Sequence, residues 1–280
     1  MGKTLLETKK RITSISSTYK VTSAMKLVST VKLRSLMARM ENYRYFASEI
    51  KDVFSYLSNN IGENKSPFFN PTLKGKKLYI LISSTLGLCG SYNYNLFEKI
   101  DSEYDKEDDI LILGNKGKNH YKDYDNVLLL EKEENDYELL AEEIVPLVID
   151  KYLDGTYREI CIVYTKYKNS ITFIPEIEKI LPLVSKDNDD YFANCLIEPD
   201  KETVLNELIP LYISSIIKGR ILESFTSEQA SRRNAMENAS DNAKDIISEL
   251  QLEFNKARQN QITSEIIDIV GASSAQKGEN

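Results

Sequence analysis

Two short glycine motifs follow apolar runs, where a glycine turn can cradle the phosphates of a nucleotide. Gly87-Leu88-Cys89-Gly90 lies between an apolar run at residues 78–82 and a helical pattern over residues 92–100, the place where dinucleotide-binding domains hold phosphate. It lacks the full GxGxxG spacing. Gly114-Asn115-Lys116-Gly117-Lys118 lacks the spacer of a P-loop and has Asn119 in place of its Ser or Thr. We therefore interpret both motifs as tight strand-to-helix turns and predict no bound cofactor.

Groups that act as acids, bases or metal ligands are sparse or poorly placed. The chain has one histidine, His120, beside a turn rich in Lys and Asp, which excludes a histidine-rich metal site. Its carboxylates lie in charge runs rather than in apolar pockets that would separate their pKa values. Three widely spaced cysteines, Cys89, Cys161 and Cys195, form no CxxC pair and indicate buried thiols in a reducing compartment. The sequence predicts neither a catalytic site nor a metal site on this chain.

The ends of the chain read as two long helices. Glycine and proline are absent from residues 3–61 and from residues 220–270. Apolar residues in both stretches alternate by four and three positions, the heptad spacing of a coiled coil, with a register shift near Lys26. We expect the helices to pair as an antiparallel, left-handed coiled coil. The predicted seam residues are Leu36, Met40, Tyr43, Ala47, Ile50, Phe54 and Leu57, and Met236, Ala239, Ala243, Ile246 and Leu250, continued by Ile262, Ile266 and Ile269.

The middle of the chain alternates strand and helix patterns, which is typical of an α/β domain with a parallel sheet. Strands are predicted at residues 78–82, 110–113, 127–130, 159–165 and 171–174, and helices at residues 92–100 and 136–153. The predicted fold class is therefore α/β, with an antiparallel coiled coil of long terminal helices and a Rossmann-like middle domain. The expected divisions are residues 1–62, 63–205 and 206–280.

Charge is distributed unevenly along the chain. The net charge is −7, yet residues 1–50 hold ten Lys or Arg against three Asp or Glu, a balance of +7 that leaves −14 for the rest. The acidic total argues against nucleic acid as a partner. The basic first helix indicates either a solvated face or a helix inserted into an acidic surround.

No apolar run approaches the roughly 18 residues of a membrane span, and the first residues resemble neither a signal nor a transit peptide.

One run near each end of the chain carries a family resemblance. Thr22-Ser23-Ala24-Met25-Lys26-Leu27-Val28-Ser29, followed by Lys32-Leu33-Arg34, and the long run from Asn255 to Ala272 are similar to the two signatures of the γ subunit of F-type ATP synthases. The turn Leu86-Gly87-Leu88-Cys89-Gly90, the segment Glu198-Pro199-Asp200 and residues 222–228 and 234–243 also resemble that family. The resemblance runs in order along nearly the whole chain and is weak at residues 101–155 and 185–195.

This resemblance implies the central stalk of a rotary motor. Antiparallel terminal helices would pass up the axis of a hexamer of three α and three β subunits. The α/β domain would form a foot bound to the ε subunit and the c-ring of the membrane sector. Proton-driven rotation would be coupled to ATP synthesis and hydrolysis at the β-subunit catalytic sites. The chain would be a non-catalytic subunit of a proton-translocating ATP synthase, peripheral on the cytoplasmic side of a bacterial-type cell membrane.

The resemblance also implies a rotor–stator interface on the terminal helices. Arg258 and Gln259 match a pair that contacts a loop of β, and Thr263 and Glu265 match positions important for coupling. Met25 matches a rotor–stator contact of the N-terminal helix. The predicted interface residues are Met25, Lys26, Arg232, Arg258, Gln259, Thr263 and Glu265, with Arg232 matching a family arginine near the coil interior.

Three other interpretations stay open at the level of sequence. One is a rotor of a related F-type-like ATPase that is not coupled to proton flow, which co-purified subunits would reveal. A second is a coiled-coil scaffold that binds nucleic acid through the basic first helix, which steeply salt-dependent DNA binding would reveal. A third is a nucleotide-dependent enzyme built on the middle domain, which titration with ATP or NAD would reveal.

Overall fold

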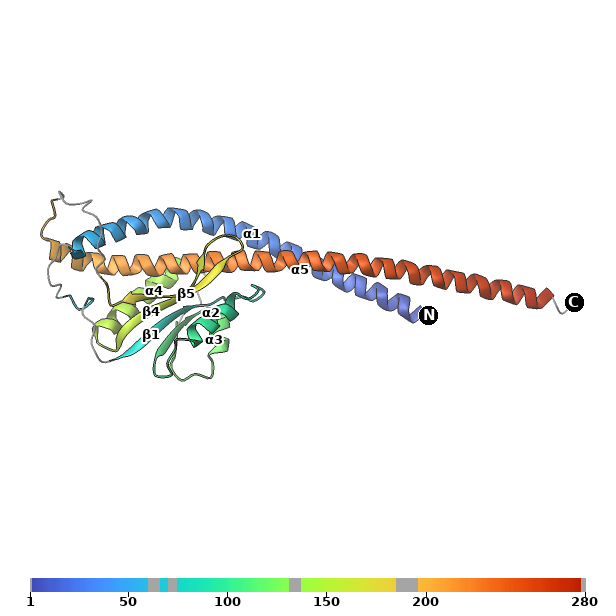
Figure 1. Cartoon of the computed structure of the whole chain (residues 1–280), viewed down its shortest axis with the longest axis horizontal. Coiled ribbons are helices and arrows are strands. Elements are labelled where there is room, and N and C mark those ends of the chain that lie inside the picture. The colour runs from blue at the N-terminus through green and yellow to red at the C-terminus, as the bar shows by residue number, and fades with distance from the viewer. Residues whose placement is uncertain (1, 60–65, 70–74, 131–136, 185–195, 278–280) are drawn as a thin grey trace. The chain divides into compact units, whose positions relative to one another are not determined.

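The chain has the predicted α/β architecture, with a long helix at each end of the sequence and a sheet formed by the residues that separate these helices in the sequence (Figure 1). The computed structural model describes residues 2–59, 66–69, 75–130, 137–184 and 196–277. The first helix, α1, spans Gly2–Asn59 and the last, α5, spans Lys201–Lys277. The chain groups into two compact units: residues 29–232 form the larger one, and residues up to 28 together with those from 233 onward form the smaller one. Within each unit α1 packs against α5. The three-part division expected from the sequence stays a prediction.

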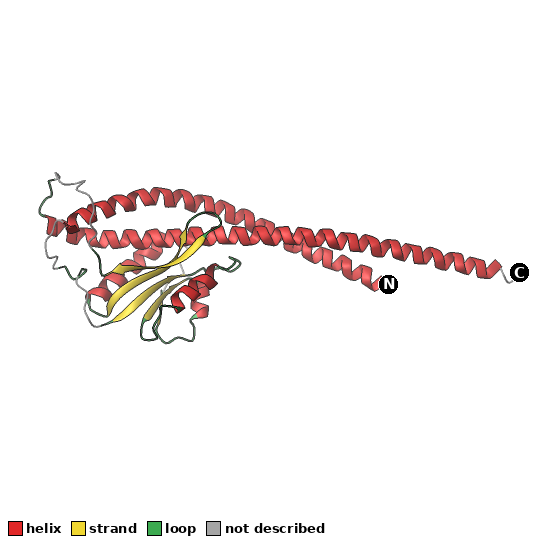
Figure 2. Cartoon of the chain, viewed as in Figure 1, coloured by secondary structure: helices red, strands yellow, loops and turns green. Residues whose placement is uncertain are grey.

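The sheet of the larger unit has five strands (Figure 2). Their order is β3-β2-β1-β4-β5. Neighbouring strands are parallel except for β5, which runs antiparallel to β4. The strands are β1 Lys76–Ile82, β2 Asp109–Leu113, β3 Val127–Leu129, β4 Tyr157–Tyr167 and β5 Phe173–Leu181.

The fifth strand corrects two expectations. We expected a strand at residues 171–174 and a parallel sheet, and found β5, a longer edge strand that runs antiparallel to β4. Its pattern was hidden because charged residues stand inside it. Glu176 pairs with Lys166 of β4, and Glu178 pairs with Arg220 of α5. An edge strand tolerates such residues, since only one side of its backbone joins the sheet.

Helices cover both faces of this sheet, as alternation along the strands requires. Leu78 and Ile80 of β1 belong to a core that includes α4 (Tyr137–Leu153), α5 and α1. Tyr79 and Leu81 point the opposite way, into a second core with α2 (Tyr92–Asp101) and α3 (Asn115–His120). The domain is therefore doubly wound around its first strand, with the two terminal helices added to one face (Figure 1).

The predicted seam of α1 is confirmed in the larger unit. Each of its seven residues, from Leu36 to Leu57, is buried or half-buried. Opposite them, α5 begins at Lys201, where the Asp200 carboxylate accepts a hydrogen bond from the Thr203 amide (2.9 Å) and satisfies one donor that a helix start leaves open. From Tyr212 to Arg232 no residue of α5 is exposed, because this part of the helix lies between α1 and the sheet.

The seam of the smaller unit differs from the one predicted. Met236, Ala243 and Leu250 are buried as expected. Ile246, however, is 41% exposed, and the heptad positions beside it are taken by Ser240, which is buried, and Ile247, which is half-buried. Because Ser240 occupies a seam position, the spacing of the apolar residues alone predicts the wrong register.

The register shift predicted near Lys26 of α1 is likewise absent. Thr22 is buried and Lys26 half-buried, four residues apart on the seam spacing. Thr22 accepts a hydrogen bond from Ser240 of α5 (2.8 Å). Polar side chains thus keep the heptad spacing where apolar ones are missing.

Candidate functional site

The first glycine turn is fastened to α5 through its carbonyl groups. Arg232 donates to the carbonyl oxygens of Leu86 (2.9 Å) and Gly87 (3.2 Å). The Ser231 hydroxyl donates to the carbonyl of Cys89 (2.7 Å). A phosphate site would instead need amide groups turned towards a ligand. The carbonyl groups of the Gly87–Gly90 turn region therefore bind side chains of α5, whereas a phosphate loop would bind a ligand through its amides.

The cleft at the carboxyl ends of β1 and β4 is occupied as well. In doubly wound sheets ligands bind at this position, where the strand order reverses. Here the Ser224 hydroxyl of α5 lies 2.7 Å from the Tyr92 hydroxyl and accepts a bond from the Thr165 amide (3.3 Å). Ser227 donates to the Thr165 carbonyl (2.9 Å). Side chains of α5 fill the place that a cofactor takes in other proteins of this architecture.

The second glycine motif serves close packing. The Gly117 amide donates to the Ser83 hydroxyl (2.9 Å), which donates to the Leu113 carbonyl (2.7 Å). A Cβ atom at Gly114 would lie 2.2 Å from the Ser83 carbonyl oxygen, and Gly114 has φ of 89°. Only glycine fits there without moving β1. This motif also reads as a strand-to-helix turn.

Arg232 forms a buried ion pair with Glu228. The arginine is 4% exposed, and its Nη1 lies 2.7 Å from a Glu228 carboxylate oxygen. Burial raises the pKa of Glu228, while the charges of Arg232 and Lys32 oppose that rise. Because its guanidinium also donates to two carbonyls, Arg232 joins α5, the glycine turn and a buried carboxylate at one point.

The predicted interface residues of α1 lie in the smaller unit. Met25 is half-buried. Lys26 places its Nζ 2.7 Å from the Glu237 carboxylate, which also pairs with Arg233 at 3.4 Å. The hydrogen bond from Lys26 lowers the pKa of Glu237. Lys26 thus links α1 to α5 close to the hydrogen bond between Thr22 and Ser240.

The remaining predicted interface residues are exposed on the last turns of α5. Arg258, Gln259, Thr263 and Glu265 all face solvent. Their recorded contacts are local: the Thr263 hydroxyl donates to the Gln259 carbonyl (2.9 Å), and Gln261 donates to the Glu265 carboxylate (2.9 Å). These side chains are free to meet another surface.

Isoleucines are interleaved with these polar residues, which corrects one more expectation. We predicted that Ile262, Ile266 and Ile269 extend the seam, yet they are 48%, 55% and 69% exposed. Gln261 and Ser264 take the half-buried positions instead. An exposed apolar stripe of this kind is typical of surfaces that bind another protein.

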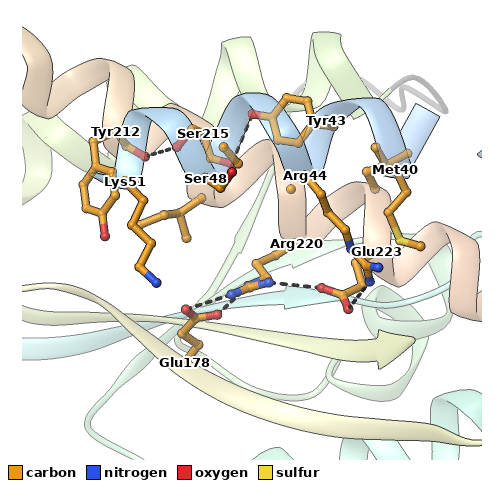
Figure 3. A pocket seen from close by; sticks show the side chains of 14 residues that line it. Met40, Tyr43, Arg44, Ser48, Lys51, Glu178, Tyr212, Ser215, Arg220 and Glu223 are labelled. Carbon is orange, nitrogen blue, oxygen red and sulfur yellow. Dashed lines mark hydrogen bonds and ion pairs between the residues drawn. The ribbon is translucent and has the colours of Figure 1, made fainter. Parts of the chain in front are cut away.

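Sequence reasoning missed a charged cluster where α1, α5 and β5 meet (Figure 3). Arg220 of α5 donates to Glu178 of β5 through two nitrogens and to Glu223 through a third. Arg44 of α1 lies 3.7 Å from Glu223. These residues are up to 179 positions apart in the chain, so no local motif could have revealed them.

Two of the three cysteines are buried and free, as expected. Burial, with Glu159 nearby, raises the pKa of Cys161 to about 12. Cys89 is buried beside Asn93, whose side-chain nitrogen lies 3.3 Å from the sulfur. Cys195 lies outside the described residues. Within those residues no group of three or more His, Cys, Asp or Glu could hold a metal ion, and no helix is apolar and long enough to cross a membrane.

Comparison with known proteins identifies the family. The family model described as ATP synthase matches residues 4–275. A rotor chain of the Euglena gracilis mitochondrial ATP synthase superposes with a TM-score of 0.65 at 18% identity, covering 94% of this chain and all of that one. A second Euglena gracilis structure, of OSCP, F1 and c-ring, contains a chain that superposes with a TM-score of 0.69 at 16% identity, covering 99% of this chain and 95% of that one.

A third structure adds a more similar sequence. It is the central stalk and c-ring of the Tetrahymena thermophila mitochondrial ATP synthase, at 25% identity and a TM-score of 0.58, covering 79% of this chain and 99% of that one. The match to the family model spans nearly the whole chain, including both terminal helices and the glycine turn that fastens α5. The chain therefore belongs to the γ-subunit family of ATP synthases.

Proposed function

We propose that this chain is the central-stalk rotor of an F-type ATP synthase, coupling proton-driven rotation to ATP synthesis and hydrolysis on the β subunits. The observation that carries the proposal is the exposed end of α5, where Ile262, Ile266 and Ile269 alternate with the polar residues Arg258 and Thr263. Membership of the γ-subunit family supports it.

The proposed partners follow from the same role. The terminal helices would face the α and β subunits of the catalytic hexamer, and the unit of residues 29–232 would meet the ε subunit and the c-ring. The complex would place this chain at the cytoplasmic side of the cell membrane as a peripheral subunit. Among the solved relatives, the Euglena gracilis and Tetrahymena thermophila structures include a c-ring, which supports that partner.

The rotor has to favour one conformation over another in each of three chemically identical sites. A bound element shifts such an equilibrium only by its differential interaction with the two states, and a swing from mostly open to mostly closed needs about 5.5 kcal/mol. Many exposed contacts can supply that bias together, since each exposed ion pair contributes about 0–1 kcal/mol. Weak single contacts also avoid deep minima that would stop rotation.

Arg258→Ala tests the proposed rotor–stator interface. We expect the purified complex to lose about fivefold in ATPase turnover, which corresponds to about 1 kcal/mol, the upper end for an exposed charged contact. Assembly should be unaffected, since Arg258 is exposed. Steady-state ATPase assays and gel filtration of the complex give the two readouts.

Lys256→Ala is the matched control, because it removes a cation that is also exposed, two residues away and on another side of the helix. It should leave turnover within about twofold. Equal turnover of the Arg258 variant and the parent complex would remove that residue from the interface. The subunits that co-purify with the native complex decide whether the motor is coupled to a proton-translocating c-ring.

A further inference from the structure

We propose that the groove between α1, α5 and β5 binds a small organic anion that has an apolar body. Arg44 and Lys51 of α1 would hold the anionic group, and Tyr43, Ile216 and Gly219 would line the body. We call this the Arg220 groove, after the residue on its floor (Figure 3). The proposal does not depend on the rotor function, because all the lining residues belong to the unit of residues 29–232.

The groove is large enough for a ligand. Its volume is about 360 Å³, within the range of small-molecule sites. Gly219 helps to create this space: a Cβ atom there would already touch the Tyr43 ring at 3.4 Å, and a longer side chain would extend into the groove. Met40, Ile216 and Leu222 add apolar surface.

The floor of the groove is a rigid ion-paired network of Arg220, Glu178 and Glu223 with a net charge of −1. The Arg220 guanidinium is held by Glu178 and Glu223 and lies 4.9 Å from the centroid of the Tyr164 ring. Glu223 is only 8% exposed in its side chain and also accepts a bond from the Tyr167 amide. A network satisfied on all sides fixes geometry and does not compete for an incoming anion.

The α1 side of the groove carries the uncompensated charge. Three cations and two carboxylates line the groove, which leaves a balance of +1. Arg44 is only loosely paired, 3.7 Å from Glu223 and with 59% of its side chain exposed. Lys51 takes part in none of the ion pairs recorded among the described residues, and Figure 3 shows its amino group reaching into the groove. The two residues are one heptad apart and therefore share a face of α1.

The hydroxyl groups of the lining narrow the ligand class. Tyr43 donates to the Ser215 carbonyl (3.1 Å), Ser215 to the Tyr212 carbonyl (2.8 Å), and Ser48 to the Tyr45 carbonyl (2.9 Å). With these three donors engaged, Tyr212 supplies the remaining hydroxyl of the lining. The groove therefore offers charge and apolar surface rather than the several donors that a sugar requires. A carboxylate, sulfonate or phosphate on an aromatic or aliphatic body fits this chemistry.

The test uses anilinonaphthalene sulfonate, a fluorescent anion on an aromatic body, titrated into the full-length chain. We expect one saturable site whose affinity falls about tenfold in Lys51→Gln, because charge-assisted hydrogen bonds are the strong ones in such sites. Lys9→Gln removes the same charge from an exposed position elsewhere on α1 and should bind like the parent. The uncharged parent compound phenylnaphthylamine should bind at least tenfold more weakly than the sulfonate.

A second variant tests the space rather than the charge. Gly219→Leu should abolish saturable binding by filling the groove, while circular dichroism reports whether the helix persists. Lys51 is exposed, so its variant folds whatever happens to Gly219→Leu. Equal affinity of the Lys51→Gln and Lys9→Gln variants for the sulfonate would overturn the proposal. Because the isolated chain is used, that failure would leave the rotor proposal untouched.

Discussion

Arg232 is the residue on which the glycine turn depends most. Its guanidinium reaches two turn carbonyls and the buried Glu228 carboxylate at once. Replacing both members of a buried ion pair by apolar side chains often changes the stability of a protein little. Removing Arg232 alone, however, would leave the buried Glu228 carboxylate without its partner.

The first residue-level prediction concerns the free energy of unfolding of Arg232→Leu. We expect a loss of about 3–5 kcal/mol at pH 8, measured by urea unfolding. Burial already raises the pKa of Glu228 in the folded chain, and without Arg232 that rise is opposed only by the charge of Lys32. A raised folded pKa gives stability that is complete below the unfolded pKa, about 4.3, and is lost as pH rises through the folded value. The variant should therefore be less impaired at pH 5 than at pH 8.

The double variant Glu228→Leu/Arg232→Leu serves as its control. It removes both charges and should recover part of the lost stability at pH 8. An Arg232→Leu loss that is the same at pH 5 and pH 8 would show that Glu228 remains ionised and compensated by other groups, with Lys32 the candidate.

At the scale of elements, the heptad seam of the smaller unit is built with polar residues at positions where a coiled coil usually has apolar ones. Ser240 bonds to Thr22, and Glu237 pairs with Lys26. Polar seam residues fix the register of two helices at some cost in stability. The register is therefore set by a few specific contacts as well as by the spacing of apolar side chains.

Adjacent isoleucines provide a direct test of that register. Ile247→Ala should cost about 1–2 kcal/mol of unfolding free energy, since Ile247 takes a half-buried seam position. Ile246→Ala should cost less than about 0.5 kcal/mol, since Ile246 is 41% exposed. Thermal unfolding of the two variants, which differ by one position only, measures both values. A larger loss for Ile246→Ala would restore the register predicted from the sequence.

Much of the element order could be predicted from the sequence, and the reasons for each failure are physical. Buried parallel strands such as β1 are continuous apolar runs. The terminal helices were predicted from long stretches that lack glycine and proline and have heptad spacing. β5 was misplaced because its charges are paired with distant residues such as Arg220. The seam near Ser240 was misread because its polar residues bond across the two helices.

One candidate site could be predicted from the sequence and the other could not. The exposure of Arg258 and Thr263 agrees with the role that the family resemblance assigns to them, and that role stays a prediction. The Arg220 groove could not be foreseen, because its lining comes from three elements, of which α1 precedes the other two by more than a hundred residues.

For the molecule as a whole, the two compact units should differ in local stability. The larger one has a core of apolar side chains on both sides of a sheet. The smaller one consists of helix segments whose seam includes Thr8, Thr22 and Ser240. Local opening free energies follow the number of buried apolar contacts, so the smaller unit should open at a lower cost in free energy than the larger one.

Hydrogen exchange of the isolated chain, followed by mass spectrometry, tests this difference. Amides of residues 5–28 and 233–270 should exchange at least tenfold faster than those of residues 36–57 and 205–230. Both sets belong to the same two helices, α1 and α5, so each helix contains its own control. Uniform protection along α5 would contradict the prediction and indicate that the helix opens as a single cooperative element.

The filling of the cleft at β1 and β4 by Ser224 and Ser227 has a pharmacological consequence. In an enzyme of this architecture a compound lodged in that cleft displaces a cofactor and blocks turnover. Here it would have to displace part of the polypeptide itself. Such a compound would act by separating α5 from the sheet. Its potency would depend on the free energy needed to displace this helix and not on competition with a metabolite.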